Sequence, residues 1–363
     1  RVSANSPSVD VPEPEKSFWR SQVKYPFQVS YAVVLDEQGK RWEVAYMDEY
    51  AGPEGYKRQA ATVVLIHGRG ANSGYWGTLM EGLLAAGYRV VALDIPHYGK
   101  SIPGNLEKPM TRSLDDVRTL FHEVVVNQLG IKRASYLGHS LGGQVALGYV
   151  VRYPQVVERL ILEAPGGLES FRSSELFDAS LKGDIQRWRE AWRRTGLLSR
   201  ERARTPETIE ADYYFQGDGR NPGYFLKDGP IPRYMTRVRQ RMISGNPAEY
   251  ERYTGMYIRE IFNVGFELKK DDPESLFARL DTIDVPIFIA FGEQDPFFPM
   301  SRVSGNQDLR NDVIKPLYER LNEEGNPPHI KIYQEAAHFI HTDIPQAFLG
   351  DVLVFLKGEQ MSN

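Results

Sequence analysis

Ser140 lies in a sequence pattern that can turn a hydroxyl into a nucleophile. Residues 138–142 read Gly-His-Ser-Leu-Gly and fit G-x-S-x-G. An apolar run, 134–137, precedes the motif, and a segment with helical spacing, 141–153, begins within it. Between a strand and a helix, such a motif predicts a sharp turn that exposes the serine, and small residues at 138 and 142 let strand and helix approach. The alternative is a glycine-rich turn with a capping serine.

A serine hydroxyl needs a base to accept its proton, and the base needs an acid to orient it. His338 follows the last apolar run of the chain, 329–333, and Asp295 follows the run before it, 286–291. If these runs are parallel strands, the three side chains lie at one edge of a sheet, where ligands bind in open α/β sheets. We therefore expect Ser140, Asp295 and His338 to form a catalytic triad.

Two further residues compete for the same roles. Glu163 ends the apolar run 159–162, where it could serve as the acid in place of Asp295. His341 follows His338 by three residues and could serve as the base, or it could simply pack beside the site. Both alternatives stay open from the sequence.

The tetrahedral intermediate of acyl transfer carries an oxyanion, which needs two preorganised N–H donors. Residues 67–70, His-Gly-Arg-Gly, follow the apolar run 62–66. The glycines on both sides of Arg69 let the main chain come close to a ligand. We assign the oxyanion hole to the backbone N–H groups of Arg69 and Leu141.

Short apolar runs alternating with helical segments must position these residues. The runs are 62–66, 89–93, 134–137, 159–162, 286–291 and 329–333. The helical segments are 75–86, 114–129, 141–153, 313–323 and 345–356. A hairpin is expected earlier, from 27–35 and 41–46 joined by Asp-Glu-Gln-Gly. Apolar strands alternating with helices predict an α/β fold with a mostly parallel central sheet covered by helices on both faces.

The alternation stops between 168 and 277, where arginines and aromatic residues are frequent instead. This interruption predicts an inserted, mainly helical cap (lid) at 168–277 on a core formed by 26–167 and 278–363. Residues 1–25 are expected to be an N-terminal tether, because 1–16 are rich in Ser, Pro, Asp and Glu. The chain begins at Arg1, which indicates a removed leader or a trimmed tag; a periplasmic or secreted location is favoured, and a cytoplasmic one is possible.

Together these pieces resemble the α/β-hydrolase fold family with a cap domain. The resemblance rests on five stretches in the family's order: 67–68, 94–101, 138–143, 291–295 and 338–345. It implies acyl transfer by Ser140, since epoxide- or halide-cleaving members would need Asp there. The sequence departs from the family at His97 and Ala337, where Gly is usual, and in the longer segment from Asp295 to His338. Asp343 is expected to cap the helix that begins near 345.

The sequence therefore predicts a serine hydrolase that cleaves a carboxylic ester through an acyl-enzyme, with a carbon–carbon bond hydrolase, an amidase or an acyl transferase as alternatives. The aromatic residues of the cap favour a small to medium substrate with an apolar or aromatic part. His97, Trp188 and Trp192 are candidate substrate-binding residues, and one of the cap arginines could meet an anionic group.

Composition limits the other possibilities. The 363 residues contain no cysteine, which excludes disulfides, thiolate metal sites and a cysteine nucleophile. The formal net charge of −4 offers no basic excess for nucleic acid or an anionic membrane surface. No apolar stretch is long enough for a membrane span, and no H-E-x-x-H pattern suggests zinc. No cofactor is expected, the partner is a small-molecule ester, and the oligomeric state stays open.

Overall fold

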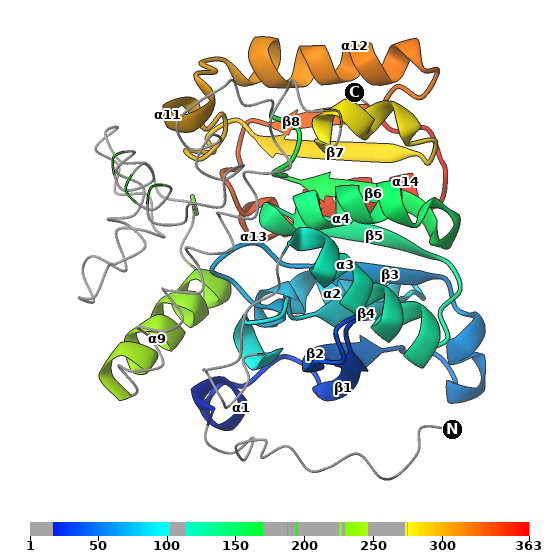
Figure 1. The fold of residues 1–363 in the computed structure, drawn as a ribbon, viewed down its shortest axis with the longest axis vertical. Helices are drawn as coiled ribbons and strands as arrows, with labels where there is room; N and C mark the ends of the chain where they lie inside the picture. Colours follow the sequence, from blue (N-terminus) through cyan, green and yellow to red (C-terminus); the bar gives the residue numbers. More distant parts are fainter. Residues whose placement is uncertain are drawn as a thin grey trace.

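The computed structural model describes residues 17–101, 113–169, 187, 190, 194, 225–226, 229–245, 273 and 275–362. Within these ranges an eight-stranded sheet runs through the middle of the molecule (Figure 1). Its strands are β1 (Ser30–Leu35), β2 (Arg41–Glu49), β3 (Thr62–Ile66), β4 (Arg89–Leu93), β5 (Ala134–His139), β6 (Val157–Glu163), β7 (Ile287–Gly292) and β8 (His329–Tyr333).

The strand order is β1-β2-β4-β3-β5-β6-β7-β8. The pairs β1–β2 and β2–β4 are antiparallel, and every other neighbouring pair is parallel. The expected α/β fold with a mostly parallel sheet is confirmed. β3 to β7 are buried along their whole length apart from two residues of β6, because helices cover both faces of the sheet.

The expected hairpin is confirmed. Leu35 pairs with Arg41 next to the turn, and Gly39 adopts a φ of 74°. The Asp36 side chain closes the turn by accepting hydrogen bonds from the backbone N–H groups of Gln38 and Lys40. A short acidic side chain and a glycine are the residue types that such a turn requires.

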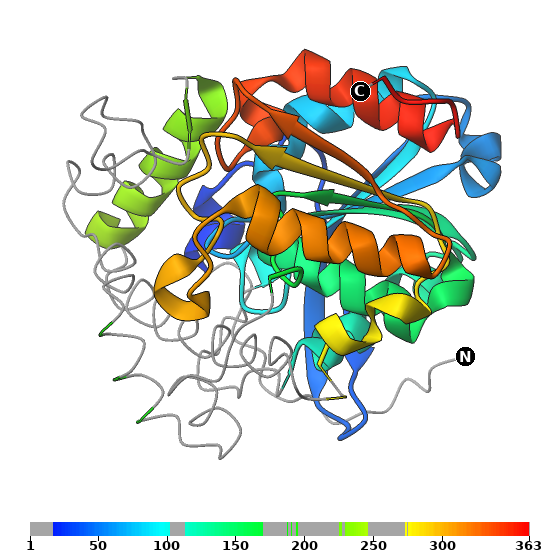
Figure 2. The ribbon, with the colours of Figure 1, turned by 90° about the horizontal axis from the view of Figure 1, so that it is seen from above.

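Helices lie on both faces of the sheet (Figure 2). α2 (Gly77–Ala85) and α14 (Pro345–Leu356) cover one face, and α3 (Leu114–His122), α4 (Leu141–Arg152) and α12 (Lys315–Glu323) cover the other. Each face has its own apolar cluster, with Met80 and Phe348 in one and Val117, Val145 and Leu317 in the other. All five helical segments expected from the sequence are present. Two of them include π-helical turns, η5 (Glu123–Gln128) after α3 and η8 (Leu309–Ile314) before α12.

The centre of the sheet contains a topological switch point. β3 lies between β4 and β5, so the chain leaves β3 towards one side and later returns on the other. Ligands bind at the carboxyl ends of the strands that flank such a point. The loops that begin at His67, after β3, and at Ser140, after β5, therefore meet at the edge where the sequence places its chemistry.

The N-terminal tether was predicted too long. From Ser17 onward the chain packs on the core, and α1 (Phe18–Gln22) buries both Phe18 and Trp19. The Lys100 ammonium holds the end of this helix by donating to the backbone oxygens of Trp19, at 2.7 Å, and of Val23. Two large aromatic side chains supply enough apolar surface to order a segment that composition alone marked as a tether. Residues 1–16 lie outside the described residues.

Of the expected cap, the structure describes α9 (Pro230–Gly245), the short segments 168–169, 225–226 and 275–277, and the single residues 187, 190, 194, 229 and 273. α9 contacts η3 (Ser73–Trp76), which follows the loop after β3. Tyr234 of α9 donates a hydrogen bond to the side-chain oxygen of Asn72, at 3.0 Å. A helix from the part of the sequence between β6 and β7 thus reaches the switch point.

Candidate active site

Ser140 occupies a strained turn between β5 and α4. Its φ of 54° and ψ of −118° lie where L-residues other than glycine are uncommon, and its side chain is nearly buried. A Cβ on Gly138 would lie 2.1 Å from the Gly142 carbonyl oxygen, and a Cβ on Gly142 would lie 2.1 Å from that of Ile66. Glycine is therefore required at both positions for strand, turn and helix to approach, as the motif indicated. Strain of this kind persists at functional sites because the surrounding structure holds it.

Asp295 and His338 are brought together at the same edge. Their side chains are joined by a 2.7 Å hydrogen bond between His338 Nδ1 and Asp295 Oδ2. The other carboxylate oxygen, Oδ1, accepts from the backbone N–H of Phe297 at 2.7 Å, which fixes the plane of the carboxylate. Since the carboxylate accepts from Nδ1–H, Nε2 of neutral His338 is left able to accept a proton.

Glu163 and His341 form a second pair beside the first. His341 Nδ1 hydrogen-bonds to both carboxylate oxygens of Glu163, the longer contact being 2.7 Å, and both side chains are buried. The His341 ring packs on Trp76, with 4.5 Å between ring centres. The two residues that compete with Asp295 and His338 are thus paired with each other. His341 Nε2 is a buried atom without a hydrogen-bond partner among the described residues.

The loop after β3 holds one peptide group in a fixed orientation. The Gly68 carbonyl oxygen lies 2.8 Å from His67 Nδ1 and 3.3 Å from the Ala71 backbone nitrogen. His67 Nε2 accepts from the Ile95 N–H at 3.0 Å, so Nδ1 carries the proton and the ring is neutral. Burial lowers the pKa of His67 accordingly. In a trans peptide N–H and C=O point in opposite directions, so holding the Gly68 oxygen also orients the Arg69 N–H.

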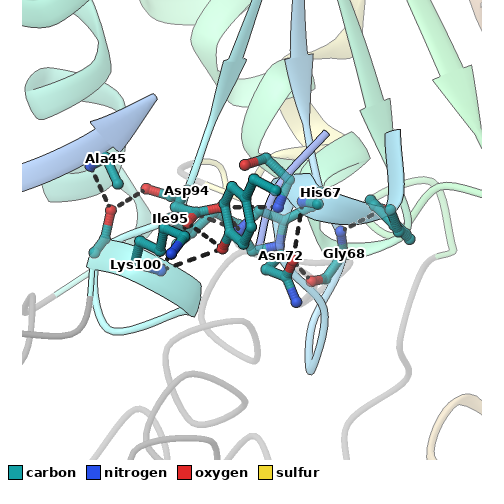
Figure 3. Close-up of polar contacts among 12 residues, drawn as sticks. Ala45, His67, Gly68, Asn72, Asp94, Ile95 and Lys100 are labelled. Atoms are coloured by element: carbon teal, nitrogen blue, oxygen red, sulfur yellow. Dashed lines mark hydrogen bonds and ion pairs between the residues drawn. The ribbon is translucent and has the colours of Figure 1, made fainter. Parts of the chain in front are cut away.

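The buried Asp94 side chain accepts hydrogen bonds from several segments next to this loop (Figure 3). Its buried carboxylate accepts from the backbone N–H groups of Ser73 and Lys100, both at 2.8 Å, and from the Tyr25 hydroxyl at 2.6 Å. Burial and the nearby Asp94 charge raise the pKa of Tyr25 well above its usual range, so its hydroxyl remains a donor. This carboxylate therefore ties the loops after β3 and β4 to the segment that follows α1.

Of the three candidate substrate-binding residues, the structure describes only His97. His97 has a φ of 71° and packs edge-on against Trp42, with 5.2 Å between ring centres. That left-handed conformation explains why glycine is usual at this position. Its contact with substrate stays a prediction. Trp188 and Trp192 lie outside the described residues. The Arg69 guanidinium is 6.0 Å from the centre of the Phe297 ring, which is itself 5.4 Å from the His338 ring.

Residues 225–226, which belong to the expected cap, contact the loop that carries His338. Phe225 is fully buried and stacks on Phe339, with 4.1 Å between ring centres. Asp343 accepts from the backbone N–H of Leu226 at 3.0 Å and from that of Ala337 at 2.8 Å. The expectation that Asp343 caps the next helix is wrong, because α14 has no side-chain cap and both carboxylate oxygens are engaged elsewhere.

The longer segment between Asp295 and His338 includes α11 (Ser301–Ser304) and η8. The buried Glu169 carboxylate holds its beginning by accepting from the Met300 backbone N–H at 2.9 Å and from the Asn306 amide at 3.1 Å. Burial raises the pKa of Glu169 although these donors oppose the rise. The additional residues are thus anchored to the chain just beyond β6, and they leave the Asp295–His338 contact intact.

Tyr75 gave no signal in the sequence beyond its place at the start of an expected helical segment. Asp94 and His341 lay in stretches that resemble the family, and Glu163 was a candidate acid, but their contacts depend on distant segments and could not be predicted. Among the described residues no group of acidic or histidine side chains could hold a metal ion. None of the helices described is both long and apolar enough to cross a membrane.

Comparison with known proteins gives relatives of one fold. Over 139 residues the chain is 35% identical to a 2-hydroxy-6-oxononadienedioate/2-hydroxy-6-oxononatrienedioate hydrolase of Paraburkholderia phymatum. The match covers 38% of this chain and 44% of the relative, so the chain spans less than half of that protein's length.

Two solved structures are similar over almost their whole length. A probable hydrolytic enzyme from Pseudomonas aeruginosa has a TM-score of 0.63 and 22% identity, with 94% of this chain and 96% of that chain covered. An esterase from Exiguobacterium antarcticum has a TM-score of 0.58 and 19% identity, with 90% and 100% covered. The family model for the alpha/beta hydrolase fold matches residues 61–325, well over half of the chain. Together with the sheet order and the strained serine turn, this match shows that the chain belongs to the α/β-hydrolase fold family.

Proposed function

We propose that this protein is a serine hydrolase that breaks an acyl bond through a covalent intermediate on Ser140. The observation that carries the proposal is the 2.7 Å contact between His338 Nδ1 and Asp295 at the edge where the strained Ser140 turn lies. A neutral histidine held in this tautomer can accept the serine proton at Nε2.

In the proposed reaction the Ser140 oxygen attacks the substrate carbonyl carbon while His338 takes its proton. The Arg69 and Leu141 N–H groups stabilise the oxyanion, and Asp295 stabilises the imidazolium. When the tetrahedral intermediate collapses, the leaving fragment takes the bond electrons and a proton from His338. Water, activated by the same histidine, then hydrolyses the acyl-enzyme and frees Ser140.

The first candidate for the bond is a carbon–carbon bond next to a ketone in an acidic substrate. The curated relative described above is named for such a compound, a dienedioate with hydroxy and oxo groups. The leaving carbon must then be stabilised as a conjugated enolate. The Arg69 guanidinium is 6.0 Å from the centre of the Phe297 ring, which lies 5.4 Å from the His338 ring, and its positive charge at this edge of the sheet suits a carboxylate-bearing substrate.

The second candidate is a carboxylic ester, which needs the same nucleophile, base and oxyanion donors. It is supported by the esterase among the proteins of similar structure. The two candidates differ only in the leaving group, an alcohol or a stabilised carbon, because the acyl half reaction is the same.

A two-part experiment tests the proposal. A fluorophosphonate probe should add its mass to wild-type protein at Ser140 and should leave Ser140→Ala unmodified. Wild type and Ser140→Ala are then assayed with 2-hydroxy-6-oxononadienedioate and with p-nitrophenyl esters of increasing chain length. A kcat/KM for the dienedioate well above that for every ester supports the first candidate, and the reverse supports the second. Labelling that persists in Ser140→Ala, or its absence in wild type, refutes the nucleophile.

A further inference from the structure

Tyr75 and His139 lie directly behind the proposed catalytic residues, and the reaction described above uses neither side chain. Tyr75 belongs to η3, just after the loop that carries Arg69, and His139 is the last residue of β5. Each has only 1% of its surface exposed. A buried hydroxyl and a buried imidazole are costly unless their hydrogen bonds are satisfied, so their partners are informative.

Three short contacts connect these side chains to two other loops. The Gly68 backbone nitrogen lies 3.0 Å from the Tyr75 hydroxyl oxygen. That oxygen lies 2.7 Å from His139 Nδ1, and His139 Nε2 lies 2.7 Å from the His338 carbonyl oxygen. Gly68 follows β3, His139 ends β5 and His338 follows β8, so one chain of contacts spans three strand ends that are remote in sequence.

The two ends of this series determine the direction of its outer hydrogen bonds, and the neutral state of the His139 ring determines the direction of the middle one. A backbone N–H can only donate, so Gly68 donates to Tyr75. A carbonyl oxygen can only accept, so His139 carries its proton on Nε2 and donates to His338. Nδ1 of the neutral ring then accepts from the Tyr75 hydroxyl. Burial, together with the nearby His338 and His341 rings, lowers the pKa of His139 well below 6.5, which keeps the ring neutral.

We propose that Tyr75 and His139 are positioning residues that hold the oxyanion loop, the nucleophile turn and the base loop at fixed mutual distances through the chain Gly68–Tyr75–His139–His338. The proposal rests on the proposed function, because it assigns these loops their roles. Neither side chain is required to touch substrate.

The two ends of this series of hydrogen bonds restrain the Arg69 N–H, which is the proposed oxyanion donor, and the His338 imidazole, which is the proposed base. At one end, the Gly68 N–H is held by Tyr75 while its carbonyl is held by His67, so the next N–H, that of Arg69, has little freedom to rotate. At the other end, fixing the His338 carbonyl restrains the backbone from which the imidazole projects. A displacement of about 1 Å in such groups costs on the order of 100-fold in rate.

The test compares two substitutions that each remove one buried hydroxyl. Tyr75→Phe breaks the chain between Gly68 and His139. Tyr136→Phe is the matched control, because Tyr136 is also 1% exposed and its hydroxyl donates to Tyr149 at 3.2 Å, away from the three loops. We expect Tyr75→Phe to lower kcat, and the rate constant of fluorophosphonate labelling, by about 10- to 100-fold relative to the control. KM should stay within about twofold of the control value, because the series of hydrogen bonds positions the reacting groups and does not bind substrate.

A loss of threefold or more in both rates relative to Tyr136→Phe supports the proposal, and a smaller loss overturns it. The substrate for kcat is whichever class turns over in the wild type. If wild-type Ser140 is not labelled at all, both the proposed function and the positioning role are refuted. If wild type is labelled normally and Tyr75→Phe matches its control, only the positioning role fails.

A second measurement needs neither activity nor a stable Tyr75→Phe variant. Long-range ¹H–¹⁵N correlation spectra of the wild-type protein at pH 7.5 report the tautomer of each histidine, and the loss of one set of signals in His139→Gln assigns His139. We expect neutral His139 with its proton on Nε2. A proton on Nδ1, or a charged ring, would reverse or break the chain and overturn the proposal.

Discussion

Acidification should destabilise this protein through two buried histidines. Burial lowers the pKa of both His67 and His139 from the ordinary value of 6.5. His67 Nε2 accepts a hydrogen bond, which requires a neutral ring, and the Tyr75 hydroxyl can donate to His139 Nδ1 only when that ring is neutral. In the unfolded chain both rings take up a proton near pH 6.5. Below that pH the unfolded state binds more protons than the folded state, so the free energy of unfolding falls as the pH falls and is recovered as the pH rises.

The loss in the free energy of unfolding depends on how far the pH lies below 6.5, the pKa of histidine in the unfolded chain. One pH unit corresponds to about 1.4 kcal/mol for each ring that stays neutral in the folded state. Between pH 7.5 and pH 5.5 a ring that stays neutral in the folded protein therefore removes on the order of 1 kcal/mol, and two such rings remove roughly twice as much. That is a large fraction of the 5–15 kcal/mol typical of a folded protein.

The assay is urea unfolding at pH 7.5 and pH 5.5 for wild type, His139→Gln and His67→Asn. Carboxylates also titrate towards this range, but they contribute about equally to all three proteins and cancel in the comparison. We expect each variant to lose on the order of 1 kcal/mol less than wild type between the two pH values. If both variants lose as much as wild type, the two rings are not held neutral in the folded protein and the hydrogen-bond directions given above are wrong.

Three other substitutions test particular contacts. Asp295→Asn should lower kcat by about 10⁴-fold because the wrong histidine tautomer is stabilised, whereas Glu163→Gln should cost far less; steady-state kinetics of both variants decides between the two acids. Gly142→Ala places a Cβ 2.1 Å from a carbonyl oxygen at the end of β3, so urea unfolding should show a loss of about 1–3 kcal/mol, and an unchanged midpoint would contradict the packing. Lys100→Met removes the three hydrogen bonds of the ammonium to the backbone oxygens of Trp19, Arg20 and Val23, and limited proteolysis should then cleave near Trp19 faster than in wild type.

Local patterns in the chain were sufficient to predict the elements of the core. Short, mainly apolar runs marked the strands from β3 onward, and Asp36 with Gly39 marked the hairpin turn, because these signals depend on burial and backbone conformation at single positions. The prediction that the tether extends to residue 25 was wrong for a related reason. Its composition is polar on average, and Phe18 and Trp19 became an anchor only because the core offers them a place to pack.

What the sequence by itself determined was the fold class, the serine turn with its two glycines, and a short set of acids and bases that follow strands. Only the tertiary structure decided how those acids and bases pair, Asp295 with His338 and Glu163 with His341. The physical reason is that a strand end fixes where a side chain begins, whereas its hydrogen-bond partner depends on the loops that arrive from other strands. The buried chain through Tyr75 and His139 exists only where three such loops meet.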